Sequence, residues 1–467
     1  MTTEPKHSHI VFVTGRLAEA RLRSVLAEMA PSDFTWEVRQ IGVKVAGLMT
    51  TEILSNRLGD VTGADKVVVP GRCRGDLEAV SARFGVPIER GPDDLADLPE
   101  HFGRRARPAR LTEHSVRIFA EIVDASRLGI PEILAKAHAL KADGADVIDI
   151  GCLPGTPFPH LEDVVGTLAR EGFTVSVDSL NTEELRRGAE AGASYLLSLT
   201  PETVDVAFEV DAVPVLIPSR HGDLDGLVQA WERLTKAGKR CLVDPILDPI
   251  MFGFTQSVVR FHDVRARLPD AEMLMGIGNL TELTDADTTG VTAVLMAMAQ
   301  ELGVGNVLVV QVSPHCRRAV RETDAARRIM HYAQTHQSLP QRISGDLMAL
   351  RDRRPWTVTP EAVDALAAQV SDANWRVEVA EDGMHVFNRD GHWVVTDPFE
   401  AWPHLNVETD GSHAFYLGVE LAKAQVAWQL GKRYAQDQDL SWGVAVDTVG
   451  YKPHRNPHGK SGKGGAS

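Results

Sequence analysis

Carboxylate, amide and hydroxyl side chains recur where short apolar segments end between residues 116 and 312. In chain order they are Asp124, Asp149, Asp178, Ser198, Asp244 and Asn279. A carboxylate binds two adjacent N–H donors well, and an Asn side chain both donates and accepts hydrogen bonds. Several carboxylates in one pocket repel one another unless a ligand, water or a cation lies between them. If the fold brings these residues together, we expect them to bind a planar ligand rich in N–H donors.

The apolar segments that carry these residues have the spacing of a parallel barrel. There are eight of them: 116–125, 147–151, 174–178, 195–199, 213–218, 241–245, 272–279 and 306–312. Each is followed by enough residues for one return helix, as a parallel strand requires. Eight such units predict a (β/α)8 TIM barrel, with its active site in the loops that follow the strands.

An alternative is that the polar residues only cap the next helix, because Asp, Asn and Ser are preferred N-caps. After Asp178, however, Asn181 is better placed as a cap. After Asp244 the next helix is expected near Thr255, which is too far away. Capping remains open for two of the residues, Asp124 and Ser198.

The rest of the chain predicts two further domains beside the barrel. The expected parts are a small doubly wound α/β domain (1–100), a linker (101–113), the barrel (114–340), a C-terminal α+β domain (355–452) and a disordered tail (453–467). In the first domain, Arg72 and Arg74 lie between a strand and a helix. They could hold a phosphate, although exposed surface arginines are the interpretation we favour.

The C-terminal domain is expected to pair three short strands and one long helix. Asp-Gly pairs separate the segments 375–379, 384–388 and 392–396, and such pairs are typical of hairpin turns. The helix is expected near residues 412–435. Its predicted buried stripe consists of Phe415, Val419, Ala422, Val426 and Leu430.

Composition excludes several classes of partner. The net charge is −15, which argues against general nucleic-acid binding, and no apolar run approaches the roughly 20 residues that cross a bilayer. Four separate cysteines without a C-x-x-C pair indicate neither a disulfide framework nor a zinc site, and we expect no protein metal site. The first residues lack the pattern of a signal peptide. A cytoplasmic protein is therefore expected.

Three motifs in the barrel give a more specific prediction. The segments GADVIDIG (144–151), VSVDS (175–179) and VDPILDPIMFGF (243–254) resemble, in this order, those of the pterin-binding barrel of dihydropteroate synthases. Nearly the whole chain is similar to the dihydropteroate synthase-related proteins of methanogens and methylotrophic bacteria. The resemblance implies that Asp178 and Asp244 hold a pterin, with Ser198 in place of the usual Asn.

The chain departs from that family where the family binds pyrophosphate and the aryl substrate. It has Gly-Asn-Leu at 278–280 where the family has Ser-Arg-Lys, and Ser-Pro-His-Cys-Arg-Arg at 313–318 where the family has Arg-x-His. We therefore predict a substitute anion site formed by His315, Arg317 and Arg318. A pyrophosphate substrate would bring Mg²⁺ with it.

The predicted function is a transferase that joins a 6-substituted dihydropterin to an arylamine, in the synthesis of tetrahydromethanopterin or a folate-type cofactor. The predicted catalytic residues are Asp178, Asp244 and Asn279. The predicted substrate-binding residues are Asp124, Asp149, Ser198, Asp248, His315, Arg317 and Arg318.

Two alternatives stay open. Segments 278–281 and 244–249 also resemble pterin-dependent methyltransferases, in which the Asn contacts the pterin near the reacting nitrogen; Asn279 would then be active. A pterin-binding protein without catalysis is the other. The expected partner is a small-molecule pterin, without nucleic acid or membrane. The sequence leaves the oligomeric state open, with a homodimer as one alternative.

Overall fold

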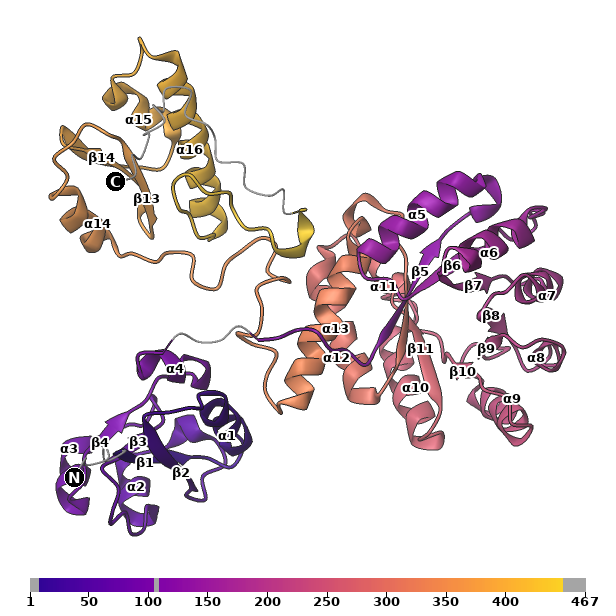
Figure 1. Ribbon diagram of the computed structural model, residues 1–467, viewed down its shortest axis with the longest axis horizontal. Coiled ribbons are helices and arrows are strands. Elements are labelled where there is room, and N and C mark those ends of the chain that lie inside the picture. The colour runs from indigo at the N-terminus through magenta and orange to yellow at the C-terminus, as the bar shows by residue number, and fades with distance from the viewer. Residues whose placement is uncertain (1–7, 105–108, 448–467) are drawn as a thin grey trace, which may run out of the picture. The chain divides into compact units, whose positions relative to one another are not determined.

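The computed structural model describes residues 8–104 and 109–447 and contains three sheets (Figure 1). The chain divides into two compact units, Met1–His114 with Arg328–Ser344, and Ser115–Arg327 with Gly345–Ser467. The tail expected at 453–467 lies outside the described residues. Among the described residues, every helix is too short or too polar to cross a bilayer.

The first unit is a four-stranded parallel sheet in the order β2-β1-β3-β4. Its strands are β1 (Ser8–Thr14), β2 (Phe34–Gln40), β3 (Lys66–Val69) and β4 (Ile88–Arg90). Its helices are α1 (Glu19–Glu28), α2 (Thr51–Arg57), α3 (Leu77–Phe84) and α4 (Leu98–His101), with 3-10 turns η1 (Ala46–Leu48) and η2 (Leu95–Asp97). One apolar cluster includes Val11 and Val67 and another includes Ile10 and Phe12, so that alternate residues of β1 fill both faces of the sheet.

The packed part of this unit continues into the segment that the sequence predicts as a linker. Leu98 is buried, and the Phe102 ring lies 5.8 Å from that of Phe12 and 4.8 Å from that of Phe34. Arg72 and Arg74 are exposed, and Arg72 lies 3.8 Å from the Asp93 carboxylate. Phosphate binding by this loop stays a prediction.

The second unit contains the predicted (β/α)8 barrel, which is confirmed as a closed barrel of eight parallel strands. The strands are β5 (Arg117–Ile122), β6 (Val147–Gly151), β7 (Thr174–Asp178), β8 (Tyr195–Leu199), β9 (Val213–Leu216), β10 (Leu242–Val243), β11 (Glu272–Gly276) and β12 (Asn306–Val309). Strands β6, β7 and β8 have the predicted bounds, and the other five are shorter than predicted.

Helices surround the strands of the barrel (Figure 1). They are α5 (Ile130–Ala142), α6 (Leu161–Arg170), α7 (Thr182–Glu190), α8 (Val206–Glu209), α9 (Leu224–Lys236), α10 (Phe254–Arg267), α11 (Gly278–Thr281), α12 (Thr288–Leu302) and α13 (Ala319–Thr335), with 3-10 turns η3 (Ala125–Arg127) and η4 (Pro314–Cys316). Asn181 caps α7 as predicted, because its side chain accepts a hydrogen bond from the Glu183 N–H. The α10 helix begins ten residues after Asp244, which therefore does not cap it.

The C-terminal part of this unit is the predicted three-stranded meander with helices. Its elements are α14 (Pro360–Ala367), β13 (Arg376–Ala380), β14 (Gly383–Asn388), β15 (Gly391–Val395), α15 (Pro398–Leu405), α16 (Gly411–Leu430) and the 3-10 turn η5 (Gly443–Ala445). The strands pair in the order β13-β14-β15, both pairs antiparallel.

The predicted buried stripe of α16 is wrong. Phe415 is 76% exposed, and Val419 and Leu430 are also exposed. The buried face instead carries Leu417, Leu421, Ala424 and Ala427, which pack with strand residues such as Val377. Both stripes have helical spacing, so periodicity alone could not choose between them. The small side chains of Ala424 and Ala427 leave room for the helix to pack closely on the sheet.

One buried arginine joins α13 to the beginning of the barrel. Arg327 is 1% exposed, and its guanidinium donates hydrogen bonds to Val116 O (2.7 Å) and Gly144 O (3.0 Å). It also pairs with the carboxylates of Asp146 and Asp324. A single side chain thus fixes the last barrel helix against the start of β5 and the loop before β6.

We predict that Arg327→Met lowers the free energy of unfolding by about 3–5 kcal/mol, because it removes the guanidinium that pairs with two carboxylates and donates to two carbonyls. Urea unfolding followed by circular dichroism measures this. Arg170→Met, which removes an exposed arginine at the end of α6, is the control and should change little. Equal stability of both variants would contradict the role of Arg327.

Candidate functional site

Three carboxylates from neighbouring strands meet inside the barrel. Asp149 of β6 lies beside Glu121 of β5 in the strand register, and Asp178 is the last residue of β7. One oxygen from each of the three carboxylates lies within 4.8 Å of the others. Because parallel strands end at the same edge of a sheet, this cluster lies where TIM barrels carry their active sites.

Asp149 is the most deeply buried of the three, with an exposure of 0%. The Ser176 hydroxyl, on the adjacent strand, donates a hydrogen bond of 2.5 Å to its Oδ1. Its Oδ2 is buried and has no hydrogen-bond partner among the described residues. Burial raises the pKa of Asp149 well above its usual value, and the charges of Asp178 and Glu121 raise it further. A ligand that donates a hydrogen bond or carries positive charge would satisfy this oxygen.

Glu121 belongs to the site although the sequence analysis did not select it. Burial raises its pKa to about 7, with smaller contributions from Asp178, Asp124 and Glu282. A Cβ at Gly151 would lie 2.5 Å from Glu121 Oε1, so the missing side chain makes room for the carboxylate. The available signal was a glutamate inside the otherwise apolar segment Ile118–Ile122.

Asp178 and Asp244 lie near enough for the charge of Asp178 to act on Asp244. Burial raises the pKa of Asp178 to about 6. Burial also raises the pKa of Asp244 to about 7, and the charge of Asp178 adds to this effect. The Ile246 N–H donates to Asp244 Oδ1 (2.8 Å), and this bond and the charge of Arg260 act in the opposite direction. Asp244 follows β10 directly, so the two residues reach the same site from separate strands.

Asn279 is not at a strand end, which corrects the sequence analysis. The β11 strand ends at Gly276, and Asn279 lies in the single-turn helix α11. Its side chain is exposed, and Nδ2 donates to Leu247 O (2.7 Å) in the segment that follows Asp244. Asn279 therefore lies beside the loop that carries Asp244.

Asp248 supports that same loop. It is buried and pairs with Arg260 at 2.7 Å, while His221 lies 3.4 Å away. The Arg260 guanidinium also donates to Ile246 O (2.7 Å). The Asp248–Arg260 pair thus fixes the backbone next to Asp244.

The capping alternative fails for both residues for which it was open. Asp124 precedes η3 with a left-handed backbone (φ 51°), makes no capping hydrogen bond and lies 3.1 Å from Arg127. Ser198 lies within β8, and the next helix, α8, has Asp205 at its N-cap. Asp124 contributes charge to the site, because it raises the pKa of Glu121.

The residues of the predicted anion site have separate partners. His315 Nε2 lies 3.0 Å from Thr281 O, in α11. Arg318 pairs with Asp447 (2.5 Å) and approaches Asp143 (4.0 Å), just after α5. Arg317 is exposed. The three side chains share no partner among the described residues, so the structure offers no support for a joint anion site there.

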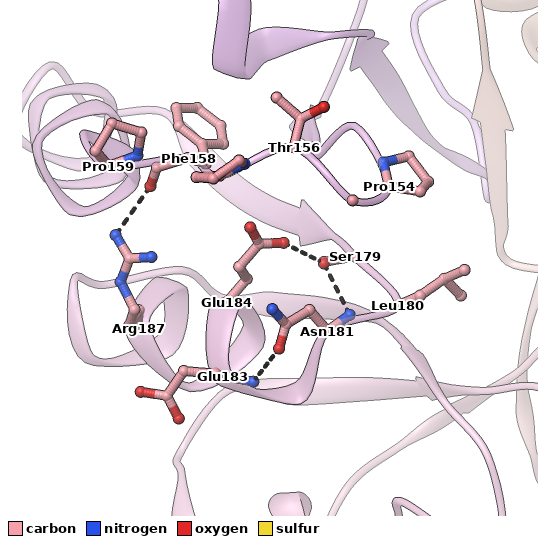
Figure 2. Close-up of a pocket in the computed structure, with 12 residues that line it drawn as sticks. Pro154, Thr156, Phe158, Pro159, Ser179, Leu180, Asn181, Glu183, Glu184 and Arg187 are labelled. Carbon is pink, nitrogen blue, oxygen red and sulfur yellow. Dashed lines mark hydrogen bonds between the residues drawn. The ribbon is translucent and has the colours of Figure 1, made fainter.

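A pocket of about 550 Å³ lies between the loop after β6 and the segment where β7 leads into α7 (Figure 2). It is lined by Pro154, Gly155, Thr156, Pro157, Phe158, Pro159, Ser179, Leu180, Asn181, Glu183, Glu184 and Arg187. The Ser179 hydroxyl donates to Glu184 Oε2 (2.5 Å), and Arg187 donates to Phe158 O (2.9 Å), which ties α7 to the proline-rich loop. The pocket has room for an aromatic ring, and its lining includes Ser179, the residue that follows Asp178 in the chain.

The cluster of Glu121, Asp149 and Asp178 also has the oxygen ligands that hard divalent cations such as Mg²⁺ prefer. Two uses therefore remain for these carboxylates, a cation and a ligand with N–H donors, and both would compensate their negative charge.

Comparison with known proteins gives one family match and one related sequence. Residues 8–93 match a family of unknown function (DUF6513). A protein of Methanocaldococcus jannaschii, described as uncharacterized, is 26% identical to this chain, over 92% of this chain and 98% of its own length.

Similar solved structures are dihydropteroate synthases. That of Yersinia pestis with a pterine-sulfa conjugate is 18% identical, covers 48% of this chain and 95% of its own, and has a TM-score of 0.37. That of Anaplasma phagocytophilum with bound 6-hydroxymethylpterin-monophosphate is 18% identical over 46% and 98%, with a TM-score of 0.36. The 7,8-dihydropteroate synthase of Vibrio fischeri is 13% identical over 49% and 96%, with a TM-score of 0.38.

The raised pKa of Asp244 predicts a pH-dependent stability difference. The folded chain holds this proton up to about pH 7, whereas the unfolded chain releases it near pH 4. The folded state therefore binds more protons between these values, and wild-type stability falls as the pH rises through this window. Asp244→Asn cannot ionise, so its stability relative to wild type should increase by about 1–3 kcal/mol between pH 5 and pH 8.

Urea unfolding at both pH values measures this difference. Asp163→Asn, at an exposed carboxylate of α6, is the matched control and should follow wild type. If Asp244→Asn and wild type show the same pH dependence, Asp244 is already ionised at pH 5 in the folded chain.

Proposed function

We propose that this protein is a pterin-binding transferase. The observation that carries the proposal is the meeting of three carboxylates, those of Glu121, Asp149 and Asp178, at the carboxyl end of the barrel strands. Asp244 lies near enough for the charge of Asp178 to raise its pKa, and the pKa of each of the other three is also raised. The 2-amino-4-oxo edge of a pterin presents two parallel N–H donors. A carboxylate can accept both, and these bonds favour its ionised form and offset its burial.

The proposed reaction joins a 6-substituted dihydropterin to an arylamine. The bond between the exocyclic carbon and the pyrophosphate oxygen breaks, and pyrophosphate leaves with the bonding electrons. The arylamine nitrogen then forms a bond to that carbon and releases one proton. Positive charge develops on the pterin in the transition state, and a pocket of fixed carboxylates stabilises it. The pocket lined by Phe158 and the prolines has space for the aryl ring.

A bound Mg²⁺ would offset the charge of the leaving pyrophosphate. The oxygens of Glu121, Asp149 and Asp178 fit such an ion, since hard cations take carboxylate ligands. The proposed role in the cell is the synthesis of a tetrahydromethanopterin or folate-type cofactor in the cytoplasm.

Methyl transfer from a methylated pterin is the second candidate, and two observations favour it. Carboxyl groups with a pKa near 7, such as Glu121 and Asp244, can supply a proton to a pterin nitrogen at neutral pH. Asn279 lies beside the Asp244 loop through its bond to Leu247 O. In addition, the predicted anion-binding residues His315, Arg317 and Arg318 have separate partners and form no joint site for pyrophosphate.

We predict that Asp178→Asn weakens the binding of 6-hydroxymethyl-7,8-dihydropterin by about 5- to 150-fold, equivalent to about 1–3 kcal/mol, because the amide has one acceptor oxygen and its NH2 group would face the second N–H donor. Isothermal titration calorimetry with the full chain measures this. Asp163→Asn is again the matched control. Unchanged affinity in Asp178→Asn would refute the assignment of Asp178 to the pterin.

The two reactions are separated by their products. With the dihydropterin pyrophosphate, an arylamine and Mg²⁺, condensation should release one pyrophosphate for each C–N product, and Asp244→Asn should slow it by at least tenfold. With a methylated tetrahydropterin and a cobalamin acceptor, methyl transfer should instead give methylcobalamin and depend on Asn279. Pterin binding with neither product would leave a binding protein without catalysis.

A further inference from the structure

Two histidines of the C-terminal domain face each other at hydrogen-bond distance. His385 of β14 and His392 of β15 are diagonal neighbours on one face of the meander, where His385 lies opposite Val394 and His392 opposite Phe387. Their ring planes are 27° apart and their centroids 5.1 Å apart, so the rings lie edge to edge. His385 Nδ1 lies 2.9 Å from His392 Nε2.

The outer nitrogen of each ring has a carboxylate partner. His385 Nε2 lies 2.8 Å from Asp382 Oδ1, and His392 Nδ1 lies 3.3 Å from Asp364 Oδ1. An ionised carboxylate only accepts hydrogen bonds, so each of these outer nitrogens carries the proton of its ring. In the neutral rings the inner nitrogens, Nδ1 of His385 and Nε2 of His392, then both present lone pairs.

Two lone pairs at 2.9 Å repel each other unless a positively charged atom lies between them. His385 is 0% exposed and is held by Asp382, so its ring cannot turn its free nitrogen toward water. Glu378 lies opposite His385 in the strand register and adds negative charge nearby.

We propose that His385 and His392 bind a transition-metal ion of the Zn²⁺ type, with Asp364 as the third protein ligand. One atom from each of these three residues lies within 4.8 Å of the others. Asp364 is on α14 and its side chain is 65% exposed. Its Oδ1 faces His392 Nδ1, so its second oxygen, Oδ2, is the one that would approach the ion, with a further position left for water. Imidazole nitrogens select Zn²⁺, Co²⁺ or Ni²⁺ over Mg²⁺.

The surrounding groups match those of known histidine metal sites. A ligating histidine usually donates its other N–H to a carboxylate, which fixes the tautomer, and Asp382 does this for His385. Zn–N bonds of about 2.0–2.1 Å in a tetrahedral site place the two nitrogens about 3.3 Å apart. When the ion binds, the two nitrogens would separate by a few tenths of an ångström, and the rings, which point at each other, would turn so that both lone pairs meet the ion. This site is separate from the carboxylate cluster of the barrel, and it does not depend on the proposed function.

The test is titration of the full chain, after treatment with a chelator, with Zn²⁺ by calorimetry and with Co²⁺ by visible absorption. Wild type is expected to bind one equivalent, and His392→Gln is expected to bind that equivalent at least tenfold more weakly and to lose the Co²⁺ absorption band. Asp364→Asn, a change at an exposed carboxylate, should weaken binding while leaving the fold unchanged by circular dichroism. His413→Gln, on α16 of the same domain, is the control and should bind like wild type.

The remaining histidines are present in wild type and in His392→Gln, so the difference between the two isolates this site. Two results would overturn the proposal. One is equal stoichiometry and affinity in wild type, His392→Gln and Asp364→Asn. The other is the absence of any stoichiometric binding to wild type, in which case a shared proton joins the two rings.

Discussion

Buried carboxylates that lie a few ångströms apart cannot all be ionised unless something compensates their charge, and this constraint governs the candidate site. Strand pairing fixes Glu121, Asp149 and Asp178 beside one another, and the closed barrel prevents them from moving apart. These carboxylates can hold protons, bind a cation or bind a ligand rich in N–H donors. A site with uncompensated carboxylates favours cations and N–H donors over other ligands, whatever the shape of the ligand.

The residues around the cluster hold it in position without neutralising its negative charge. Arg260 is the cation that acts on Asp244, but it is already paired with Asp248 and donates to Ile246 O, so it supports the loop more than it neutralises the site. Ser176 satisfies only one oxygen of Asp149. The loop and the strands are thus firmly held while the carboxylates remain uncompensated, which is the arrangement of a preorganised binding site.

Sequence reasoning predicted the barrel, and it selected three of the four carboxylates of the candidate site, for physical reasons. The spacing of apolar segments reports βα units directly, and Asp178 and Asp244 stand where strands end. Glu121 was not selected because the first apolar segment was expected to continue to residue 125, and Asn279 was misplaced because the apolar run continues past β11 into α11. The α16 face and the histidine pair depend on which side of an element meets the sheet, which periodicity leaves undecided.

The glycine that ends β6 has a consequence for evolution. A methyl group at Gly151 would occupy the place of Glu121 Oε1, so the two positions are sterically linked across neighbouring strands. Homologues that keep a glutamate at position 121 are expected to keep glycine at 151, and those with a larger residue at 151 are expected to carry a shorter one at 121. Covariation of residues 121 and 151 would therefore show which homologues retain the buried carboxylate at position 121.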